Sequence, residues 1–583
     1  MTAPLASDNA TAGAARAGAI LGTLVAAGAV HVVLSPGSRS TPLVLAASVL
    51  ARSSTLKIHV VVDERAAAFV ALGLARATRL PTLLFCTSGS AGAHYFPALV
   101  EANASDGAII AITADRPARL QGVGAAQTIS QSQLYGAHVR HSVNIGADSD
   151  ASHARALTAM AVLRAVAPTL GPVHINVAFE EPLWVPGLAE ASASALAVVC
   201  PQPGPCPTLP PGVTARLRAS RRPIIVAGAH LGPGDHEAVA ALSRAFGAPI
   251  IADGASGLRE LLPPDVVTVT TAEALLRPSP WRDELTPDLI FRVGRIPTTR
   301  AVVEWLTSVR DCFTVLIEPS GYIFDPAGAA DVLLATTAAA ASATLTAAAV
   351  PAPRAWSHRW AGAERAARAV IGPIAASTFW GGALISAVVA TLRQRTTPPP
   401  LFVASSMAIR EFDLVTPLRS GEGSPIPLYV SRGANGIDGN IATATGLALA
   451  ARSAVAILGD LAFRHDIGAL LAARELGAHV VVLVVDNGGG GIFEYLPIAA
   501  HDDFTPFFLT PQQSDVAALA HGAGVRVIEL TTVAALPAAF DEALQGSGPT
   551  VLIARTDRTA SVACYRACLT AVDAALATYG GVA

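Results

Sequence analysis

Short apolar runs alternate with alanine-rich stretches along most of the chain. The runs have the length of strands and the stretches between them have the length of helices, which together predict parallel α/β sheets. In the first third of the chain, four runs end in polar clusters at Ser35, Asp63, Thr87 and Asp115. The run over residues 58–62 is interpreted as a buried strand. Because ligands bind at the carboxyl ends of parallel strands, these clusters mark a candidate site.

Two proline-rich stretches, around residues 201–211 and 348–356, divide the sequence. At roughly 150 residues per domain, a chain of 583 residues has room for about three or four domains. We therefore expect three α/β domains, each a parallel sheet flanked by helices, over residues 1–198, 212–347 and 357–583.

Composition narrows the class of protein. Hydrophobic residues make up 52% of the chain and charged residues 14%, which excludes a largely disordered protein. The formal net charge is −3 without a basic stripe, so we expect no nucleic-acid partner. Much of the hydropathy comes from alanine, so we expect no membrane span. The six cysteines lack metal-binding spacing, which favours reduced thiols in a cytoplasmic protein.

The sharpest chemical signal lies in the third block. A predicted strand ends at Gly459-Asp460, and the next predicted strand ends at Asp486-Asn487, followed by a run of glycines. A helix predicted over residues 465–476 joins the two strands. In a right-handed βαβ unit both strands end at the same edge of the sheet, so we expect Asp460 and Asn487 to meet there. Carboxylate, amide and carbonyl oxygens suit Mg²⁺ rather than zinc, and glycines let the backbone approach a diphosphate.

Two of the acidic candidates also have purely structural explanations. Asp460 alone could cap a helix, but its strand context and the second polar cluster favour a binding site. Glu64 precedes an alanine-rich helix predicted over residues 65–77, and an acid in a first helical turn stabilises the helix dipole.

The spacing from Gly459-Asp460 to Asn487 resembles the signature of thiamine diphosphate enzymes. The resemblance implies that Asp460, Asn487 and the carbonyl of Gly489 hold Mg²⁺ (or Mn²⁺) against the cofactor diphosphate. It also makes Glu64 the carboxylate at N1′ of the aminopyrimidine. This chain departs from the family at Asp486, where many members have asparagine, which adds a negative charge near a diphosphate.

Further motifs narrow the resemblance. They begin with Ser35-Pro36-Gly37-Ser38-Arg39 and occur in order at residues 35–43, 63–65, 86–89, 114–117, 124–128, 171–176, 406–410, 432–439 and 491–497. In these motifs the chain resembles the 2-succinyl-5-enolpyruvyl-6-hydroxy-3-cyclohexene-1-carboxylate synthases of menaquinone biosynthesis. The match is weakest in the middle block and in the C-terminal tail.

The resemblance implies a transferase that decarboxylates 2-oxoglutarate and adds the resulting carbanion to isochorismate. The two substrates carry several carboxylates, which the planar fork of arginine binds well. The resemblance also implies a homodimer or homotetramer with active sites at the subunit interface. The implied catalytic residues are Glu64, Arg39, Gln127, Ser406, Arg410 and Arg432. The implied cofactor-binding residues are Ser38, Glu64, Gly459, Asp460, Ile437, Asn487, Gly489, Ile492 and Phe493. The implied substrate-binding residues are Arg39, Arg116, Arg300, Ser406, Arg410, Arg432, Phe493 and Leu496.

Three other functions stay open at this stage. Another thiamine diphosphate-dependent carboligase or decarboxylase would act on smaller 2-oxo acids and need fewer arginines. A non-catalytic protein that binds a carboxylate metabolite would fit Asp486, and also Ser405, where family members commonly have asparagine. A nucleotide-binding oxidoreductase would use the glycine turn at Gly228, which lacks the dinucleotide fingerprint.

Overall fold

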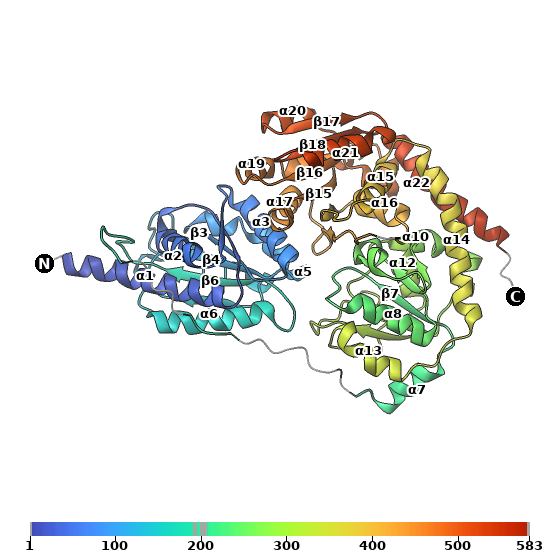
Figure 1. The fold of residues 1–583 in the computed structure, drawn as a ribbon, viewed down its shortest axis with the longest axis horizontal. Helices are drawn as coiled ribbons and strands as arrows, with labels where there is room; N and C mark the ends of the chain where they lie inside the picture. Colours follow the sequence, from blue (N-terminus) through green and yellow to red (C-terminus); the bar gives the residue numbers. More distant parts are fainter. Residues whose placement is uncertain (1–2, 190–194, 199–205, 207, 422, 580–583) are drawn as a thin grey trace.

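Three six-stranded sheets follow one another along the chain, and every strand pair in them is parallel. The computed structural model describes residues 3–189, 195–198, 206, 208–421 and 423–579. Figure 1 shows three lobes, with the N-terminal sheet at one end and the central and C-terminal sheets side by side at the other. Each sheet lies inside one of the three predicted blocks, whose end points stay a prediction. Most of the predicted linker over residues 201–211 lies outside the described residues.

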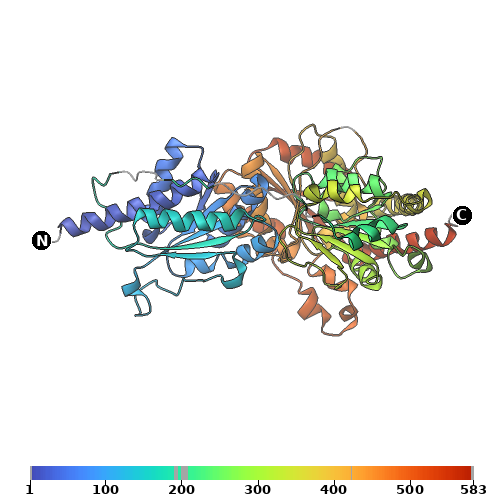
Figure 2. The ribbon, with the colours of Figure 1, turned by 90° about the horizontal axis from the view of Figure 1, so that it is seen from below.

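The N-terminal sheet has the strand order β2-β1-β3-β4-β6-β5. Helices α1, α2 and α6 cover one face and helices α3 and α5 cover the other, so neighbouring residues of β1 enter different cores. Viewed from below, α6 lies across this sheet (Figure 2). The elements are α1 (Ala3–Ala26), β1 (His31–Leu34), α2 (Thr41–Ser53), β2 (Lys57–Val60), α3 (Glu64–Thr78), β3 (Thr82–Cys86), α4 (Ser90–Ala93), α5 (Phe96–Ala104), β4 (Ile109–Asp115), β5 (Ser142–Ile145), α6 (Ala151–Val166) and β6 (Val173–Ala178).

The interpretation of residues 58–62 as a buried strand is wrong. Strand β2 is the edge strand of its sheet, and the side chains of Val60 and Val62 are 51% and 78% exposed. A short apolar run does not distinguish a central strand from an edge strand, because that depends on which strand pairs beside it.

The C-terminal sheet, β14-β13-β15-β16-β18-β17, has the same pattern of connections as the N-terminal sheet, whereas the central sheet has the different order β12-β11-β10-β7-β8-β9. The central elements are α7 (Pro211–Ala219), β7 (Pro223–Ala227), α8 (Asp235–Phe246), β8 (Ile250–Ala252), α9 (Leu258–Leu261), β9 (Thr268–Val269), α10 (Ala272–Leu275), α11 (Pro280–Glu284), β10 (Leu289–Val293), α12 (Arg300–Ser308), β11 (Phe313–Ile317), β12 (Val332–Leu334) and α13 (Ala338–Ala347). The C-terminal elements are α14 (Arg354–Ala376), α15 (Gly381–Arg393), β13 (Leu401–Val403), α16 (Met407–Val415), β14 (Leu428–Val430), α17 (Asn440–Ala451), β15 (Ala454–Gly459), α18 (Asp460–His465), α19 (Gly468–Glu475), β16 (Val480–Asp486), η5 (Gly491–Tyr495), α20 (Val516–Gly522), β17 (Arg526–Leu530), α21 (Leu536–Gln545), β18 (Thr550–Arg555) and α22 (Arg558–Thr578).

The N-terminal and C-terminal domains meet where α3 packs on α17 (Figure 1). Two glycines allow the two backbones to touch there. A Cβ atom on Gly73 would lie 2.1 Å from the backbone oxygen of Thr443, and one on Gly446 would lie 2.2 Å from the backbone oxygen of Val70. The surrounding apolar side chains of both domains form one continuous core.

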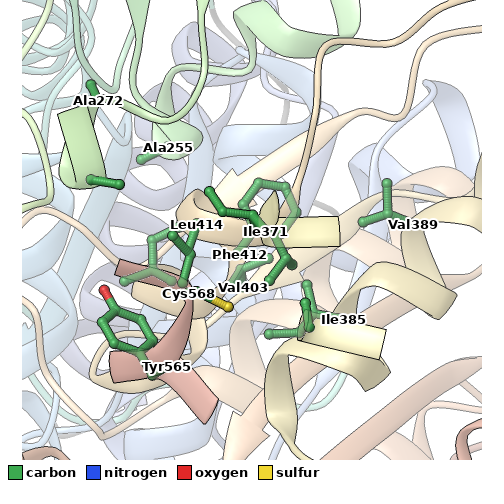
Figure 3. Close-up of a cluster of buried hydrophobic side chains, with 14 of the residues drawn as sticks. Ala255, Ala272, Ile371, Ile385, Val389, Val403, Phe412, Leu414, Tyr565 and Cys568 are labelled. Carbon is green, nitrogen blue, oxygen red and sulfur yellow. The ribbon is translucent and has the colours of Figure 1, made fainter. Parts of the chain in front are cut away.

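The central and C-terminal domains share a second core, built largely from α14, α15, α16 and α22. In Figure 3, Phe412 and Leu414 of α16 lie close to Tyr565 and Cys568 of α22. By length and composition alone α22 could cross a membrane, but it packs along α14 and buries Tyr565 and Cys568, as a core helix does. The shared core fixes α16 and α22 relative to the central domain.

Candidate active site

The carboxyl ends of β15 and β16 form the floor of a cavity of about 410 Å³. The two strands are parallel neighbours with Gly459 level with Val485, so Asp460 and Asn487 follow at the same edge of the sheet. Both side chains line this cavity, as predicted. We call it the sheet-edge cavity; its other lining residues include Ser406, Arg410, Glu411, Arg432, Ile437, Asn440, Gly489, Ile492 and Phe493.

Two oxygens in the sheet-edge cavity are ready to accept a cation. Asp460 Oδ2 and Asn487 Oδ1 are buried and have no hydrogen-bond partner among the residues that the structure describes. Burial raises the pKa of Asp460 to about 6; the Asp486 carboxylate adds to the rise, and the Arg464 guanidinium offsets part of it. No three His, Cys, Asp or Glu side chains gather in the described chain, so a cation here would also need amide and carbonyl oxygens. This donor set fits Mg²⁺ with a diphosphate.

The glycine turn after β16 is held close to a neighbouring loop. Gly489 has φ +138°, and a Cβ atom on it would lie 2.2 Å from the carbonyl oxygen of Leu509. The Gly490 N–H donates to the same oxygen at 2.7 Å. Only glycine permits this conformation and this close approach. The turn therefore keeps the Gly489 backbone at the cavity.

The prediction of one continuous helix over residues 465–476 is wrong. The chain forms α18 and α19 with a break at Asp466, whose carboxylate accepts the Ala442 N–H at 2.9 Å. Asp466 thus binds an otherwise unpaired N–H in the first turn of α17, a contact that no local pattern in the sequence reveals.

Helix α16 begins with a strained turn that directs two predicted residues at the cavity. Ser406 has φ +67°, an uncommon value for a residue with a side chain. The Arg410 guanidinium, one helical turn later, donates to the Ser406 carbonyl at 2.7 Å. Ser405 donates its hydroxyl hydrogen to the Ser431 carbonyl at 2.5 Å, which ties this turn to the segment that carries Arg432.

The N-terminal domain positions the loop that carries Arg432 and Ile437. The Glu101 carboxylate accepts the N–H groups of Gly433 and Ala434 at 3.0 and 2.6 Å. Burial lowers the pKa of Arg432. The carboxylates of Asp253 and Glu101 oppose this shift, but neither of them forms an ion pair with Arg432. Arg432 therefore faces the sheet-edge cavity as a cation that lacks a direct counter-ion in the described chain.

A second cavity of about 570 Å³ adjoins the first and shares Met407, Arg410, Ile492 and Phe493 with it. We call it the arginine cavity, because Arg277, Arg300, Arg410 and Arg566 all line it. Leu496 lines it as well, so five of the predicted residues meet here: Arg300, Arg410, Ile492, Phe493 and Leu496. Its remaining lining residues, missed by the sequence reasoning, include Glu273, Arg277, Tyr495, Tyr565 and Arg566.

The predicted residues of the N-terminal domain line neither cavity in the described chain. Ser38 lines a separate surface hollow. Arg39 is buried and pairs with Glu181 at 2.7 Å. Arg116 donates to the Ser88 hydroxyl and to the Gln127 carbonyl, each at 2.5 Å. The structure thus separates the predicted residues into two groups, one at each of two sheet edges.

Glu64 is the first residue of α3, as predicted. The cap of this helix is Asp63, whose side chain accepts the Arg65 N–H at 2.9 Å. Asp63 is therefore the cap, and Glu64 is the acid of the first helical turn, where it also stabilises the helix dipole.

The nucleotide site considered at Gly228 has a simpler explanation. A Cβ atom on Gly228 would lie 1.8 Å from the carbonyl oxygen of Arg295. The glycine serves the packing of two backbone segments, which leaves no space for a phosphate at that point.

Known proteins resemble this chain over nearly its whole length. The thiamine pyrophosphate enzyme N-terminal TPP binding domain matches residues 16–134, and the C-terminal TPP binding domain matches residues 425–554. A 2-succinyl-5-enolpyruvyl-6-hydroxy-3-cyclohexene-1-carboxylate synthase of Myxococcus xanthus is 38% identical, covering 93% of this chain and 94% of the relative. The chain belongs to this synthase family.

Other members of the synthase family show similar agreement. Those of Geobacillus thermodenitrificans and Lysinibacillus sphaericus are 35% and 32% identical and cover 93% and 96% of this chain. The three-sheet architecture is thus the three-domain thiamine diphosphate-binding fold that the sequence predicted.

Proposed function

We propose that this protein decarboxylates 2-oxoglutarate and adds the resulting four-carbon unit to isochorismate, giving 2-succinyl-5-enolpyruvyl-6-hydroxy-3-cyclohexene-1-carboxylate in menaquinone biosynthesis. One structural observation carries the proposal: the unpartnered oxygens of Asp460 and Asn487 lie in a cavity that adjoins a chamber lined by four arginines. Membership of the synthase family supports it further. Four of the five described cysteines, Cys86, Cys312, Cys564 and Cys568, are buried free thiols, which supports a cytoplasmic enzyme.

Thiamine diphosphate with Mg²⁺ (or Mn²⁺) is the cofactor this site would hold. When bound, thiamine diphosphate supplies a nucleophilic carbon and an electron sink for decarboxylation. Asp460, Asn487 and the Gly489 carbonyl would hold the metal ion. Gly459, Ile437, Ile492 and Phe493 would line the cofactor, and all except Gly459 carry apolar surface into the sheet-edge cavity.

Glu64 would hold a proton at N1′ of the aminopyrimidine, and Ser38 would contact the cofactor from the same domain. A carboxyl group beside an apolar cofactor face binds its proton more tightly, which suits proton transfer near neutral pH. The proposal is supported by the position of Glu64 at the start of α3, just past the carboxyl end of β2, the edge of a parallel sheet at which ligands bind.

The arginines would bind the substrate carboxylates. Arg410 and Arg432 line the sheet-edge cavity, so they would hold the 2-oxoglutarate carboxylates with help from the Ser406 hydroxyl. Arg300, Phe493 and Leu496 line the arginine cavity and would receive the acceptor. Arg39, Arg116 and Gln127 would complete the site from the N-terminal domain.

A complete site would form between two subunits. Support comes from the absence of Glu64 among the described residues that line the two cavities and from the exposed apolar side chains next to both groups. Val60 and Val62 precede Glu64 in the sequence, and Ile437 and Leu496 adjoin the two cavities; all four are exposed in the single chain. We therefore propose a homodimer or homotetramer with active sites at the subunit interface.

A product assay tests the reaction. Purified protein is incubated with thiamine diphosphate, Mg²⁺ and 2-oxoglutarate, with and without isochorismate, while CO₂ and product mass are followed. We expect an adduct that requires both substrates. CO₂ release without any adduct would instead indicate another thiamine-dependent decarboxylase or carboligase.

Mixing two inactive variants tests the shared site. In a dimer of Glu64→Gln and Asp460→Asn subunits, one interface site would contain both substituted residues and the other neither. Co-expression should therefore restore about one quarter of wild-type activity for random pairing of subunits. If Glu64 and Asp460 of the same chain served one site, every site would carry a substitution and activity would not return.

A further inference from the structure

Glu273 is an acidic residue in the cavity that four arginines line. Among the described residues that line the arginine cavity, it alone carries a carboxyl group. It lies on α10 of the central domain, while Arg410 and Arg566 reach the cavity from α16 and α22 of the C-terminal domain. A lone carboxyl group in a chamber for polycarboxylates needs an explanation, because a carboxylate repels such ligands.

The arginines do not need Glu273 as a partner. Arg277 pairs with Asp573 at 3.3 Å, and Arg300 pairs with Glu304 at 2.6 Å. Arg566 donates to the Glu494 carbonyl at 3.1 Å. No ion pair reaches Glu273 within the described chain. Arg410 donates to the Ser406 carbonyl and attracts Glu273 electrostatically without forming an ion pair with it, so no guanidinium group of the cavity depends on this acid as its direct partner.

Glu273 has hydrogen-bonding capacity to spare. Its Oε2 accepts the Ala301 N–H at a long 3.4 Å, and the Thr299 hydroxyl group lies within hydrogen-bonding reach of the same carboxyl group, which leaves further acceptor sites on its two oxygens. Burial, with a contribution from Asp413, raises the pKa of Glu273 to about 7. Near neutral pH the group is thus often uncharged, which weakens its repulsion of a substrate carboxylate.

Glu273 supplies the only carboxyl acceptor among the described residues that line the cavity, beside the hydroxyl groups of Thr299, Tyr495, Tyr565 and Thr570, which can also accept a hydrogen bond. Guanidinium groups carry only hydrogen-bond donors, so they recognise carboxylates but cannot accept a hydrogen bond from a hydroxyl group. The product of the proposed reaction carries a hydroxyl group on its cyclohexene ring. On the basis of the proposed function, we propose that Glu273 accepts the hydrogen bond of the ring hydroxyl of the acceptor substrate and thereby selects a hydroxylated polycarboxylate.

The test compares two acceptors, isochorismate and a ring that lacks only the hydroxyl group. Calorimetry measures binding of each to the holoenzyme with thiamine diphosphate and Mg²⁺ but without 2-oxoglutarate, so no turnover is needed. We expect the wild-type protein to prefer the hydroxylated ring at least about 100-fold, since a site built around a hydroxyl rejects its analogue strongly. Glu273→Ala should reduce that preference to less than about tenfold, and Glu273→Gln, which keeps an acceptor oxygen, should retain an intermediate preference.

Arg300→Gln is the matched control, because Ala301, which donates to Glu273, follows Arg300 at the start of α12. This control should weaken binding of both rings alike and leave the preference unchanged. If Glu273 only anchors α12, then Glu273→Ala will behave like Arg300→Gln and the proposal is wrong. Equal binding of both rings by the wild-type protein, or binding of neither, would also overturn it.

CO₂ release from 2-oxoglutarate alone is measured in parallel. In the wild-type protein this release reports the first half of the proposed reaction without the acceptor. Loss of CO₂ release in the wild type with the ring preference intact would refute the proposed reaction while supporting the role of Glu273.

Discussion

The two groups of site residues differ in whether their polar atoms already have hydrogen-bond or ion-pair partners within the chain. In the C-terminal domain, Asp460 and Asn487 present buried oxygens without partners, and Arg432 has no ion-pair partner among the described residues. In the N-terminal domain, Arg39 is already paired with Glu181, and Arg116 is bonded to Ser88. A ligand gains new bonds at the first group, whereas at the second it must replace bonds that exist. The oxygens of Asp460 and Asn487 are therefore suited to hold a cofactor, and Arg39 and Arg116 to exchange partners in each turnover.

The largest effect is expected for Glu64, the acid proposed to hold a proton at N1′ of the aminopyrimidine. Glu64→Gln should lower kcat by roughly 10²–10⁴, the usual contribution of a general acid–base group. Thiamine diphosphate binding, measured by calorimetry, should change little because the diphosphate contacts remain. Asp63→Asn is the control, since asparagine also caps a helix. Equal losses in both variants would mean that Glu64 acts only through the helix.

The second-largest effect is expected for the unpartnered oxygen of Asp460 in the C-terminal group. Asp460→Asn should weaken Mg²⁺-dependent binding of thiamine diphosphate by at least about 100-fold, because losing a directly bound carboxylate costs more than losing a group behind it. Asp486→Asn removes the neighbouring charge and should keep binding or tighten it. Tight Mg²⁺-dependent binding by the Asp460 variant would disprove its assignment as a metal ligand. Calorimetry of the cofactor with and without Mg²⁺ measures both.

The pH dependence of stability should also reveal the burial of acidic side chains in the C-terminal group. Burial raises the pKa of Glu411 from 4.5 to about 8, so between these pH values the folded apoprotein keeps a proton that the unfolded chain loses. The free energy of unfolding therefore falls as the pH rises from about 4.5 to about 8, and Glu411→Gln should remove a few kcal/mol of that fall. Denaturant unfolding of the apoprotein across this range provides the measurement. Identical pH curves for wild type and variant would contradict the expectation, and exposed Glu237→Gln should leave the curve unchanged.

The smallest effect concerns the satisfied N-terminal group. If a substrate carboxylate must displace Glu181 from Arg39, then Glu181→Gln should lower KM for one substrate by up to about fivefold, since the pair is largely solvent-exposed on the glutamate side. Glu180→Gln, which breaks the neighbouring pair with Arg119, should have no effect. A higher KM in Glu181→Gln would instead show that the pair holds Arg39 in its working position. Steady-state kinetics for both substrates decide between these outcomes.

The sequence predicted those features that depend on local order. Asp460 and Asn487 each follow an apolar strand, and the parallel sheet then brings them to one edge without further information. The start of α3 at Glu64 is equally local. The exposed edge position of β2 was not predictable in this way, because the run of Val60 and its neighbours looks the same wherever its strand pairs.

Residues that only the packing between domains brings together were not predicted from the sequence. Glu273 lies in the short helix α10 of the central domain, Arg277 follows two residues after that helix ends, and Arg566 lies near the chain end, where the motifs were weakest. Only the packing of α10 against α16 and α22 gathers them around one cavity. A single sequence offers no signal for such a meeting, since each residue alone resembles a surface charge.

The contact between Gly73 and Gly446 sets a limit on how this chain can diverge. Each glycine touches backbone atoms of the opposite helix rather than a side chain. A methyl group at either position would collide with a carbonyl oxygen that every amino acid possesses, so no substitution on the facing helix can compensate for it. The two positions cannot vary as a pair in the manner of ordinary core residues. Each must stay glycine independently for as long as α3 and α17 keep this separation.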